Sequence, residues 1–319
     1  MLIKNLISVI VPCYNEEQSL ADFMRELNKM MVRMQEVDFE VLLINDGSKD
    51  NTLNIMKEMA EQDNRIIYFS FSKNFGKEAA IYAGLQNARG NYIVVMDADL
   101  QDPPELLPKM YQAVTEEGFD SAAARRINRK GEPLVRSIFA NIFYRLINHL
   151  SDVEIADGAR DYRLMNRKFS SALLSLKEYN RFSKGLYGWV GFKNKWIEFE
   201  NVERIKGESS WSFWSLFKYS LEGIVAFSTL PLVVSSAVGI LFCLIAVLVV
   251  FYIVVRKVLF GDPVDGWASI ICAITFLGGL QLFCIGILGQ YLSKMYLEIK
   301  NRPVFIIDES NREKKDEKI

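Results

Sequence analysis

The sequence predicts an α/β protein with a mostly parallel sheet, followed by a carboxyl-terminal part that crosses a membrane. Short apolar runs rich in β-branched residues alternate with helical patterns as far as about residue 124. Such alternation with short links is typical of a parallel sheet that carries helices on both faces. Farther along, two apolar runs at about 230–255 and 267–292 each exceed the roughly 20 residues needed to cross a bilayer core.

Five strands are expected in a first domain of residues 1–205. They are short apolar runs that end at turn-forming or polar residues, and they cover residues 7–11, 39–44, 66–71, 92–96 and 120–124. Between the first two strands, apolar residues recur three and four positions apart, the spacing of a half-buried helix: Leu20, Phe23, Met24, Leu27, Met30 and Met31. Further helices are expected through Leu53, Met56 and Met59, and in an alanine-rich segment that ends near Asn87.

Polar residues follow four of these strands. They are Asn15 and Glu16, Asp46, Lys73 and Asn74, and Asp97 and Asp99. Ligands of open parallel sheets bind beyond the carboxyl ends of the strands. We therefore expect these residues to form one site.

Asp97 and Asp99 follow a strand whose composition indicates burial on both faces, and alternation along the strand predicts that both point to the same side. Two carboxylates this close repel each other unless a cation neutralises them. A hard divalent ion with oxygen ligands, Mg²⁺ or Mn²⁺, is the expected occupant, and such an ion usually also binds substrate phosphates. Asp102 is instead expected to cap the helix that begins near Pro103 and Pro104.

The composition argues against several classes of protein. With a net charge of -1, no strongly basic face is implied, and nucleic acid is not an expected partner. No Gly-x-Gly-x-x-Gly follows the first strand and no Gly-Lys-Ser loop is present, which argues against NAD-binding and ATP-hydrolysing sites. Of the four cysteines, three lie in the apolar runs and Cys13 stands alone, as expected in a reducing compartment.

The membrane-associated part is expected to begin with an amphipathic helix at residues 206–228. Its aromatic residues suit the headgroup region of a bilayer, and they include Trp211, Phe213, Trp214 and Phe217. Two transmembrane helices are expected within residues 229–294. Because the amino terminus lacks a convincing signal peptide, the first domain and the tail (295–319) are both expected on the cytoplasmic side. A strand-like stretch of the tail, at 302–307, is expected to pair with a neighbouring subunit.

Four sequence blocks resemble the signatures of family-2 glycosyltransferases with a GT-A fold. The blocks are PCYNE at 12–16, NDGS at 45–48, NFGK at 74–77 and DADLQDPP at 97–104. More narrowly, the chain resembles bacterial polyprenyl-phosphate glycosyltransferases related to dolichyl-phosphate mannose synthase, among them the bactoprenol glucosyltransferases. The resemblance runs from about residue 7 to 304 and includes DYRLM at 161–165 and FSTLPL at 227–232.

The resemblance implies a nucleotide-sugar site and a metal site. Asp46 would bind the uracil ring of a UDP-sugar. The wall of the nucleotide pocket would be the loop 12–16, through Pro12, Tyr14, Asn15 and Glu16. The sugar and ribose region would be lined by Lys77, Asp97 and Ala98. Asp99, with help from Gln101, would hold Mg²⁺ or Mn²⁺ on the diphosphate.

Basic residues supply candidates for an acceptor-phosphate site. Arg125, Arg126 and Arg129 are expected on a loop after the fifth strand, and their guanidinium groups suit phosphate oxygens. The alternative is a solvated run of charge. The phosphate site would be completed by Arg181, Arg204 and Lys206.

Asp157 and Asp161 are the remaining acid–base candidates. In relatives that glycosylate hydroxyl groups, an aspartate at this place deprotonates the acceptor. A phosphate monoester has a second pKa near 6 and is already ionised at neutral pH. We therefore expect positioning or weak base work, from Asp161 first and Asp157 second. His149, the one histidine, lies in an apolar helical stretch and is expected to be structural.

Together these features predict an inverting transfer of glucose or N-acetylglucosamine from UDP to undecaprenyl phosphate at the cytoplasmic membrane face. A flippase and a downstream transferase would use the product, and the relatives imply a homotetramer. Two alternatives are weaker. A processive polysaccharide synthase of the same fold would carry a Gln-x-x-Arg-Trp block and usually more spans. A non-catalytic membrane scaffold would have no reason to keep the Asp97 and Asp99 pair.

Overall fold

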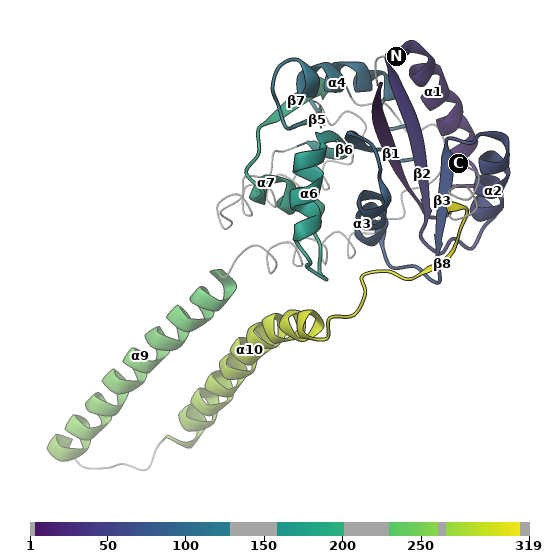
Figure 1. The fold of residues 1–319 in the computed structure, drawn as a ribbon. Helices are drawn as coiled ribbons and strands as arrows, with labels where there is room; N and C mark the ends of the chain where they lie inside the picture. The colour runs from purple at the N-terminus through teal and green to yellow at the C-terminus, as the bar shows by residue number, and fades with distance from the viewer. Residues whose placement is uncertain (1–3, 128–157, 201–229, 261–265, 313–319) are drawn as a thin grey trace.

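The computed structural model describes residues 4–127, 158–200, 230–260 and 266–312 (Figure 1). Several residues with predicted roles lie outside these ranges: Arg129, His149, Asp157, Arg204 and Lys206, together with the amphipathic segment at 206–228. Their roles stay predictions from the sequence.

Within the described residues, an eight-stranded mixed sheet has the order β7-β5-β6-β4-β1-β2-β3-β8. Its central strands are parallel to one another: β1 (Asn5–Cys13), β2 (Val37–Asn45), β3 (Ile66–Phe71) and β4 (Tyr92–Val95). They confirm four of the predicted strands, with ends that differ slightly. Their apolar residues are buried on both faces, as is usual in a parallel sheet covered by helices.

The other half of the sheet is formed by β5 (Ser121–Arg126), β6 (Ala159–Asn166) and β7 (Asn194–Phe199). β6 runs antiparallel to both β4 and β5, whereas β7 is parallel to β5. Because β5 continues along β7, Arg125 lies opposite Glu198 and Arg126 opposite Phe199. These two arginines therefore lie in the strand, which corrects the expectation that they lie on a loop after it.

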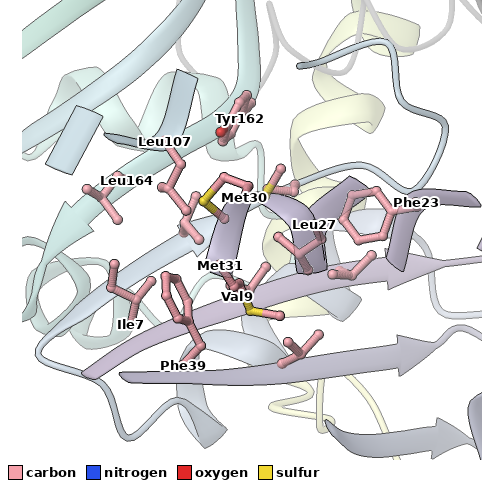
Figure 2. Packing of buried hydrophobic residues seen from close by; sticks show 14 of the residues in the cluster. Ile7, Val9, Phe23, Leu27, Met30, Met31, Phe39, Leu107, Tyr162 and Leu164 are labelled. Carbon is pink, nitrogen blue, oxygen red and sulfur yellow. The ribbon is translucent and has the colours of Figure 1, made fainter. Parts of the chain in front are cut away.

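Helices cover both faces of the sheet and bury an apolar cluster on each. One face carries α1 (Leu20–Arg33), α2 (Thr52–Gln62) and α4 (Leu107–Thr115). The other carries α3 (Lys77–Asn87), α6 (Arg167–Ser175) and α7 (Ser183–Trp189). On the first face, Phe23 and Leu27 of α1 pack in one cluster with Val9 and Phe39 of the strands (Figure 2). All six apolar positions predicted for α1 are buried.

Two long helices extend away from the sheet domain (Figure 1). They are α9 (Leu230–Phe260), of 31 residues, and α10 (Trp267–Ile299), of 33 residues. Large apolar side chains on both are exposed, for example Leu248 and Leu282. Among the described residues, one segment, Phe276–Ile299, is long and apolar enough to cross a membrane, judged by length and composition. The structure therefore supports one candidate span of the two predicted.

After α10 the chain returns to the sheet domain. β8 (Ile307–Ser310) pairs antiparallel with β3 of the same chain, so the expected pairing with a neighbouring subunit is not what the structure shows. The register is held by Asn311, whose Oδ1 accepts a hydrogen bond from Tyr68 N at 2.9 Å and whose Nδ2 donates to Ile66 O at 3.3 Å. β8 thus covers backbone groups of β3 that an edge strand would leave unpaired.

Candidate active site

The loops after β1 and β2 are hydrogen-bonded to each other at the carboxyl edge of the sheet. Asn15 has a left-handed backbone, with φ 56°. Its N–H donates to Ser48 Oγ at 3.0 Å, and its Oδ1 accepts from Lys49 N at 2.8 Å. Among the other predicted wall residues, Pro12 is half-buried at the end of β1. On the loop that follows, Glu16 is half-buried and Tyr14 is exposed. The bonds join the two loops into one surface, where the nucleotide pocket was predicted.

Asp46 is buried below this surface, with 3% of its area exposed. Its Oδ1 accepts a hydrogen bond from Phe75 N at 2.6 Å, and its Oδ2 accepts one from Gly76 N at 2.9 Å. Burial raises the pKa of Asp46 to about 6, although both hydrogen bonds act to lower it. Next to it, a Cβ on Gly47 would lie 2.5 Å from the carbonyl carbon of Lys73, so a glycine is required there. Asp46 therefore organises the loop that leads into α3, and its contact with the uracil ring stays a prediction.

Lys77, the first residue of α3, bridges two carboxylates, one on the turn after β4 and one on β6. Its Nζ lies 2.7 Å from Asp97 Oδ1 and 2.6 Å from Asp161 Oδ2. Burial alone would raise the pKa of Asp161, but the charge of Lys77, with help from Lys184 and Arg160, holds it well below its usual value. Within the chain, the ammonium group of Lys77 thus supplies positive charge beside Asp97. The sequence placed Lys77 in the nucleotide-sugar site and gave no sign of its contact with Asp161.

The predicted metal ligands, Asp99 and Gln101, lie on one turn after β4. Asp99 Oδ1 accepts a hydrogen bond from Gln101 N at 3.1 Å, and Gln101 Oε1 accepts one from Arg160 Nη2 at 3.2 Å. A carboxylate and an amide oxygen suit Mg²⁺ or Mn²⁺, and Mg²⁺ usually takes one or two protein carboxylates and completes its shell with water and substrate phosphates. In the described part of the chain, no cluster of three or more His, Cys, Asp or Glu side chains forms a metal centre by itself. The pair fits a shared site of protein and diphosphate.

Asp102 is not the helix cap that was predicted. The 3₁₀ turn η1 (Pro104–Leu106) begins without a side-chain cap. Asp102, with 1% of its area exposed, instead accepts a hydrogen bond from Arg160 Nε at 2.8 Å. A buried carboxylate needs such a partner, because an unpaired charge is strongly disfavoured away from water. Arg160 comes from β6, 58 positions later, and local sequence patterns cannot reveal it.

Arg181 is not placed as an open ligand for a phosphate. Its Nη1 donates to Leu176 O at 2.5 Å and its Nη2 to Leu173 O at 3.2 Å, while the guanidinium lies 4.3 Å from the ring centre of Tyr82. The residue is 9% exposed. Arg181 thus caps the carboxyl end of α6, whose last carbonyls have no donor within the helix. This corrects the predicted role in the phosphate site.

Arg125 and Arg126 lie on β5, next to the strand that carries Asp161. β5 is antiparallel to β6, and Arg125 is opposite Ala159, two residues before Asp161. Both arginines are half-buried, and Arg125 Nη1 lies 3.9 Å from Glu198 Oε1. A phosphate ligand at this edge is compatible with their position.

Glu78 was not found by sequence reasoning. Its Oε2 accepts hydrogen bonds from the backbone N–H of Ser183, at 3.0 Å, and from the Ser183 hydroxyl. Burial, and then the charge of Asp161, raises the pKa of Glu78 to about 7. The one signal in the sequence is its place beside Lys77 in the first turn of a helix, where glutamate is common for electrostatic reasons.

The sequence of the chain is similar to those of known proteins. The family model described as glycosyl transferase family 2 matches residues 8–174. The Bacillus subtilis protein CsbB is 44% identical over 313 residues, 98% of this chain and 94% of that one. The SfII prophage-derived bactoprenol glucosyl transferase of Shigella flexneri is 38% identical over 306 residues, 96% of this chain and 98% of that one.

Among solved structures, glucosyl-3-phosphoglycerate synthase from Mycobacterium tuberculosis shows a looser similarity, with a TM-score of 0.46 and 18% identity over 69% of this chain and 78% of that one. The mixed sheet with helices on both faces agrees with the GT-A fold expected of the family. The family match, together with relatives that align over nearly the whole chain, shows that the chain belongs to glycosyl transferase family 2.

Proposed function

We propose that the chain transfers glucose or N-acetylglucosamine from a UDP-sugar to undecaprenyl phosphate, with inversion, at the cytoplasmic face of a membrane. The observation that carries the proposal is the meeting of Lys77, Asp97 and Asp161 at the carboxyl edge of the sheet, beside the joined loops after β1 and β2. Relatives that are 36–38% identical over nearly the whole chain are named bactoprenol glucosyl transferases or a homologue of one, which supports the lipid acceptor.

The donor would bind against the joined loops. Asp46 keeps the loop before α3 in place through Phe75 and Gly76, and the uracil ring would lie between that loop and Pro12, Tyr14, Asn15 and Glu16. Ala98 is buried between Asp97 and Asp99, so the backbone at this point can approach the ribose and sugar closely.

Asp99 and Gln101 would hold a Mg²⁺ or Mn²⁺ ion on the diphosphate. Such an ion neutralises the charge that develops on the leaving UDP. Within the chain, Arg160 orients Gln101 through the hydrogen bond to its Oε1 and is itself fixed by Asp102. This support fixes the position of the Gln101 side chain on the turn after β4.

On the acceptor side, the ion pair with Lys77 makes Asp161 a weak base, because the pKa of its carboxyl group is held well below the usual value. A phosphate acceptor does not need a strong base, since its second pKa is near 6. Asp161 and Lys77 would then act by position and charge: they orient the attacking phosphate oxygen and the sugar. Arg125 and Arg126 would bind the phosphate from β5. Asp157, Arg129, Arg204 and Lys206 remain further candidates.

The membrane would hold the enzyme through α9 and α10. With a rise of about 1.5 Å per residue, helices of 31 and 33 residues are long enough to cross a hydrocarbon core of about 30 Å. We propose two spans, an interfacial segment at 206–228 and a homo-oligomer, with a flippase and a downstream transferase as partners in the pathway.

Purified full-length protein incubated with undecaprenyl phosphate and a panel of nucleotide sugars tests this function. We expect UDP release that requires the lipid, and a single sugar on the lipid phosphate by mass spectrometry. A chain of several sugars would instead indicate a processive synthase. If no donor in the panel gives a lipid-linked sugar, the proposed function is wrong.

A further inference from the structure

We propose that the end of α10 is a positioning clamp for the active site, formed by Lys294 and Glu298. The clamp holds the loop at residues 176–182, which joins α6 to α7 and leads to the bond between Ser183 and Glu78. The proposal deepens the proposed function and rests on it, because it assigns to a membrane helix the task of placing the lipid phosphate at the catalytic edge.

The clamp consists of charged groups that bind the loop directly. Glu298 Oε1 and Oε2 both lie 3.0 Å from Tyr179 N, and Oε1 also accepts from Asn180 N at 3.2 Å. One turn earlier, Lys294 Nζ donates to Asn180 Oδ1 at 3.1 Å. Two oppositely charged side chains four positions apart thus bind neighbouring loop residues. Glu298 accepts from the backbone N–H groups of Tyr179 and Asn180, and Lys294 donates to the side chain of Asn180. Hydrogen bonds that involve an ionised group are stronger than those between neutral groups.

From the clamped residues, direct contacts lead to the catalytic edge. Arg181, the next residue, caps α6 and stacks on Tyr82 of α3. Ser183 then binds Glu78 in the first turn of α3. Glu78 adjoins Lys77, whose ammonium group pairs with Asp97 and Asp161. A shift of the loop relative to α10 would therefore displace the first turn of α3, which carries Lys77 and Glu78.

The segment after α10 reaches the same helix from a second side. Phe305 stacks on Phe71 with ring centres 5.0 Å apart and makes an edge contact with Tyr82 at 6.3 Å. Ser72 N donates to Ile306 O at 3.1 Å before β8 joins the sheet. Figure 1 shows this segment running from the end of α10 to the edge at β3. Tyr82 is thus held between the segment after α10 and Arg181.

The position of α10 relative to the active site matters for a lipid substrate. The phosphate of a polyprenyl chain is confined to the membrane surface, whereas a nucleotide sugar arrives from solution. A fixed link between a membrane helix and the carboxylates of the site would therefore affect the lipid substrate more than the nucleotide.

The test compares Glu298→Ala, Glu298→Gln and the control Lys300→Met, all in full-length protein reconstituted in bilayers that contain undecaprenyl phosphate. Lys300 is a charged residue at the same end of α10, but its described contact is with the ring of Tyr296 on its own helix. Kinetics are measured against the lipid at saturating donor, and the dissociation constant of UDP is measured separately.

We expect Glu298→Ala to lower kcat/KM for the lipid about tenfold, through loss of charged hydrogen bonds, and to leave UDP binding unchanged. Glu298→Gln, which keeps one acceptor oxygen, should have an intermediate effect, and Lys300→Met none. Unchanged lipid kinetics in Glu298→Ala would overturn the proposal. So would an equal loss of UDP binding, which would indicate a general structural role.

Hydrogen exchange provides a readout that does not depend on activity. The amides of Tyr179 and Asn180 should be protected in the wild-type protein and in Lys300→Met, and should exchange faster in Glu298→Ala. If the wild-type protein makes no lipid-linked sugar but shows this difference, the clamp exists and the proposed function is wrong. If the amides exchange alike in all variants, the clamp is wrong whatever the activity.

Discussion

Lys77 Nζ lies 2.6 Å from Asp161 Oδ2, although the two residues are 84 positions apart in the chain. Lys77 begins the helix that follows the donor-side loop, and Asp161 lies on β6, next to the strand that leads to Asp97. The contact therefore joins the donor side of the site to the acceptor side. Because the same ammonium group pairs with both carboxylates, a substitution of Lys77 changes the electrostatic environment of Asp97 and of Asp161.

Replacing Lys77 by methionine should lower turnover by about a hundredfold, the size of effect found when one charged or hydrogen-bonding group is removed from a preorganised site. The variant leaves Asp97 and Asp161 as neighbouring carboxylates without their shared counter-charge, and the pKa of Asp161 should rise. Lys77→Arg keeps the charge and should recover part of the loss. The measurement is kcat with a UDP-sugar and a short-chain polyprenyl phosphate. Wild-type turnover in Lys77→Met would rule out a role in the reaction.

Replacing Asp99 by asparagine should lower turnover by about a hundredfold or more, because it would remove a charged ligand from the proposed metal ion on the leaving diphosphate. Addition of a chelator should inactivate the wild-type protein, and Mg²⁺ or Mn²⁺ should restore it. Asp22→Asn is a suitable control, since Asp22 pairs with Arg25 on the surface of α1. Full activity of Asp99→Asn in the presence of chelator would refute the metal assignment.

The central strands could be predicted because their sequence pattern has one simple cause. The runs in β1 to β4 are apolar throughout, since helices cover both faces, and polar residues follow each strand at the edge where ligands bind. The sequence therefore placed the candidate site at that edge. It could not show which side chains meet there, because partners such as Lys77 and Asp161 belong to different elements.

The sequence did not predict β6, because charged side chains are buried or paired on both of its faces. Arg160 points toward Asp102 on one face, while Asp161 binds Lys77 and Arg163 is buried on the other. Arg163 Nη1 donates to Ser121 Oγ at 2.9 Å and to Asn194 Oδ1 at 2.6 Å. These contacts conceal the alternation of apolar and polar residues that identifies a strand. Each of them depends on a residue distant in sequence.

Replacing Glu78 by glutamine should change how stability depends on pH. The pKa of Glu78 is raised from its ordinary 4.5 to about 7, so between these values the folded state binds more protons than the unfolded state. The contribution of Glu78 to the free energy of unfolding is fully present below about pH 4.5, and it is lost as the pH rises through 7. The loss amounts to at most about 3 kcal/mol. Glu78→Gln should remove this part of the dependence.

The measurement is the melting temperature of both proteins in detergent from pH 5 to pH 8. The melting temperature of Glu78→Gln should rise relative to that of the wild type as the pH increases. Asp46, whose pKa is also raised, contributes a slope of the same sign to both proteins and cancels in the difference. A difference in melting temperature that stays constant over the range would contradict the raised pKa of Glu78.

Replacing Asp161 by asparagine tests the nature of the acceptor. Lys77 holds the pKa of Asp161 well below its usual value, so this carboxylate stays ionised from pH 6 to pH 9 and takes up a proton poorly. A general base is typically worth about 10²–10⁴ in rate, whereas a group that only positions an ionised phosphate should be worth less. We expect Asp161→Asn to lose about 10- to 100-fold.

The pH–rate profile separates these two roles. With a short-chain polyprenyl phosphate as acceptor, the loss in Asp161→Asn should be the same at every pH above about 7, because the acceptor is already ionised there. The wild-type profile should show no step that belongs to Asp161 in this range. If the rate of the variant instead climbs with pH toward that of the wild type, hydroxide is replacing a missing base. Asp161 would then deprotonate the acceptor, and its bond to Lys77 would have to break before the reaction.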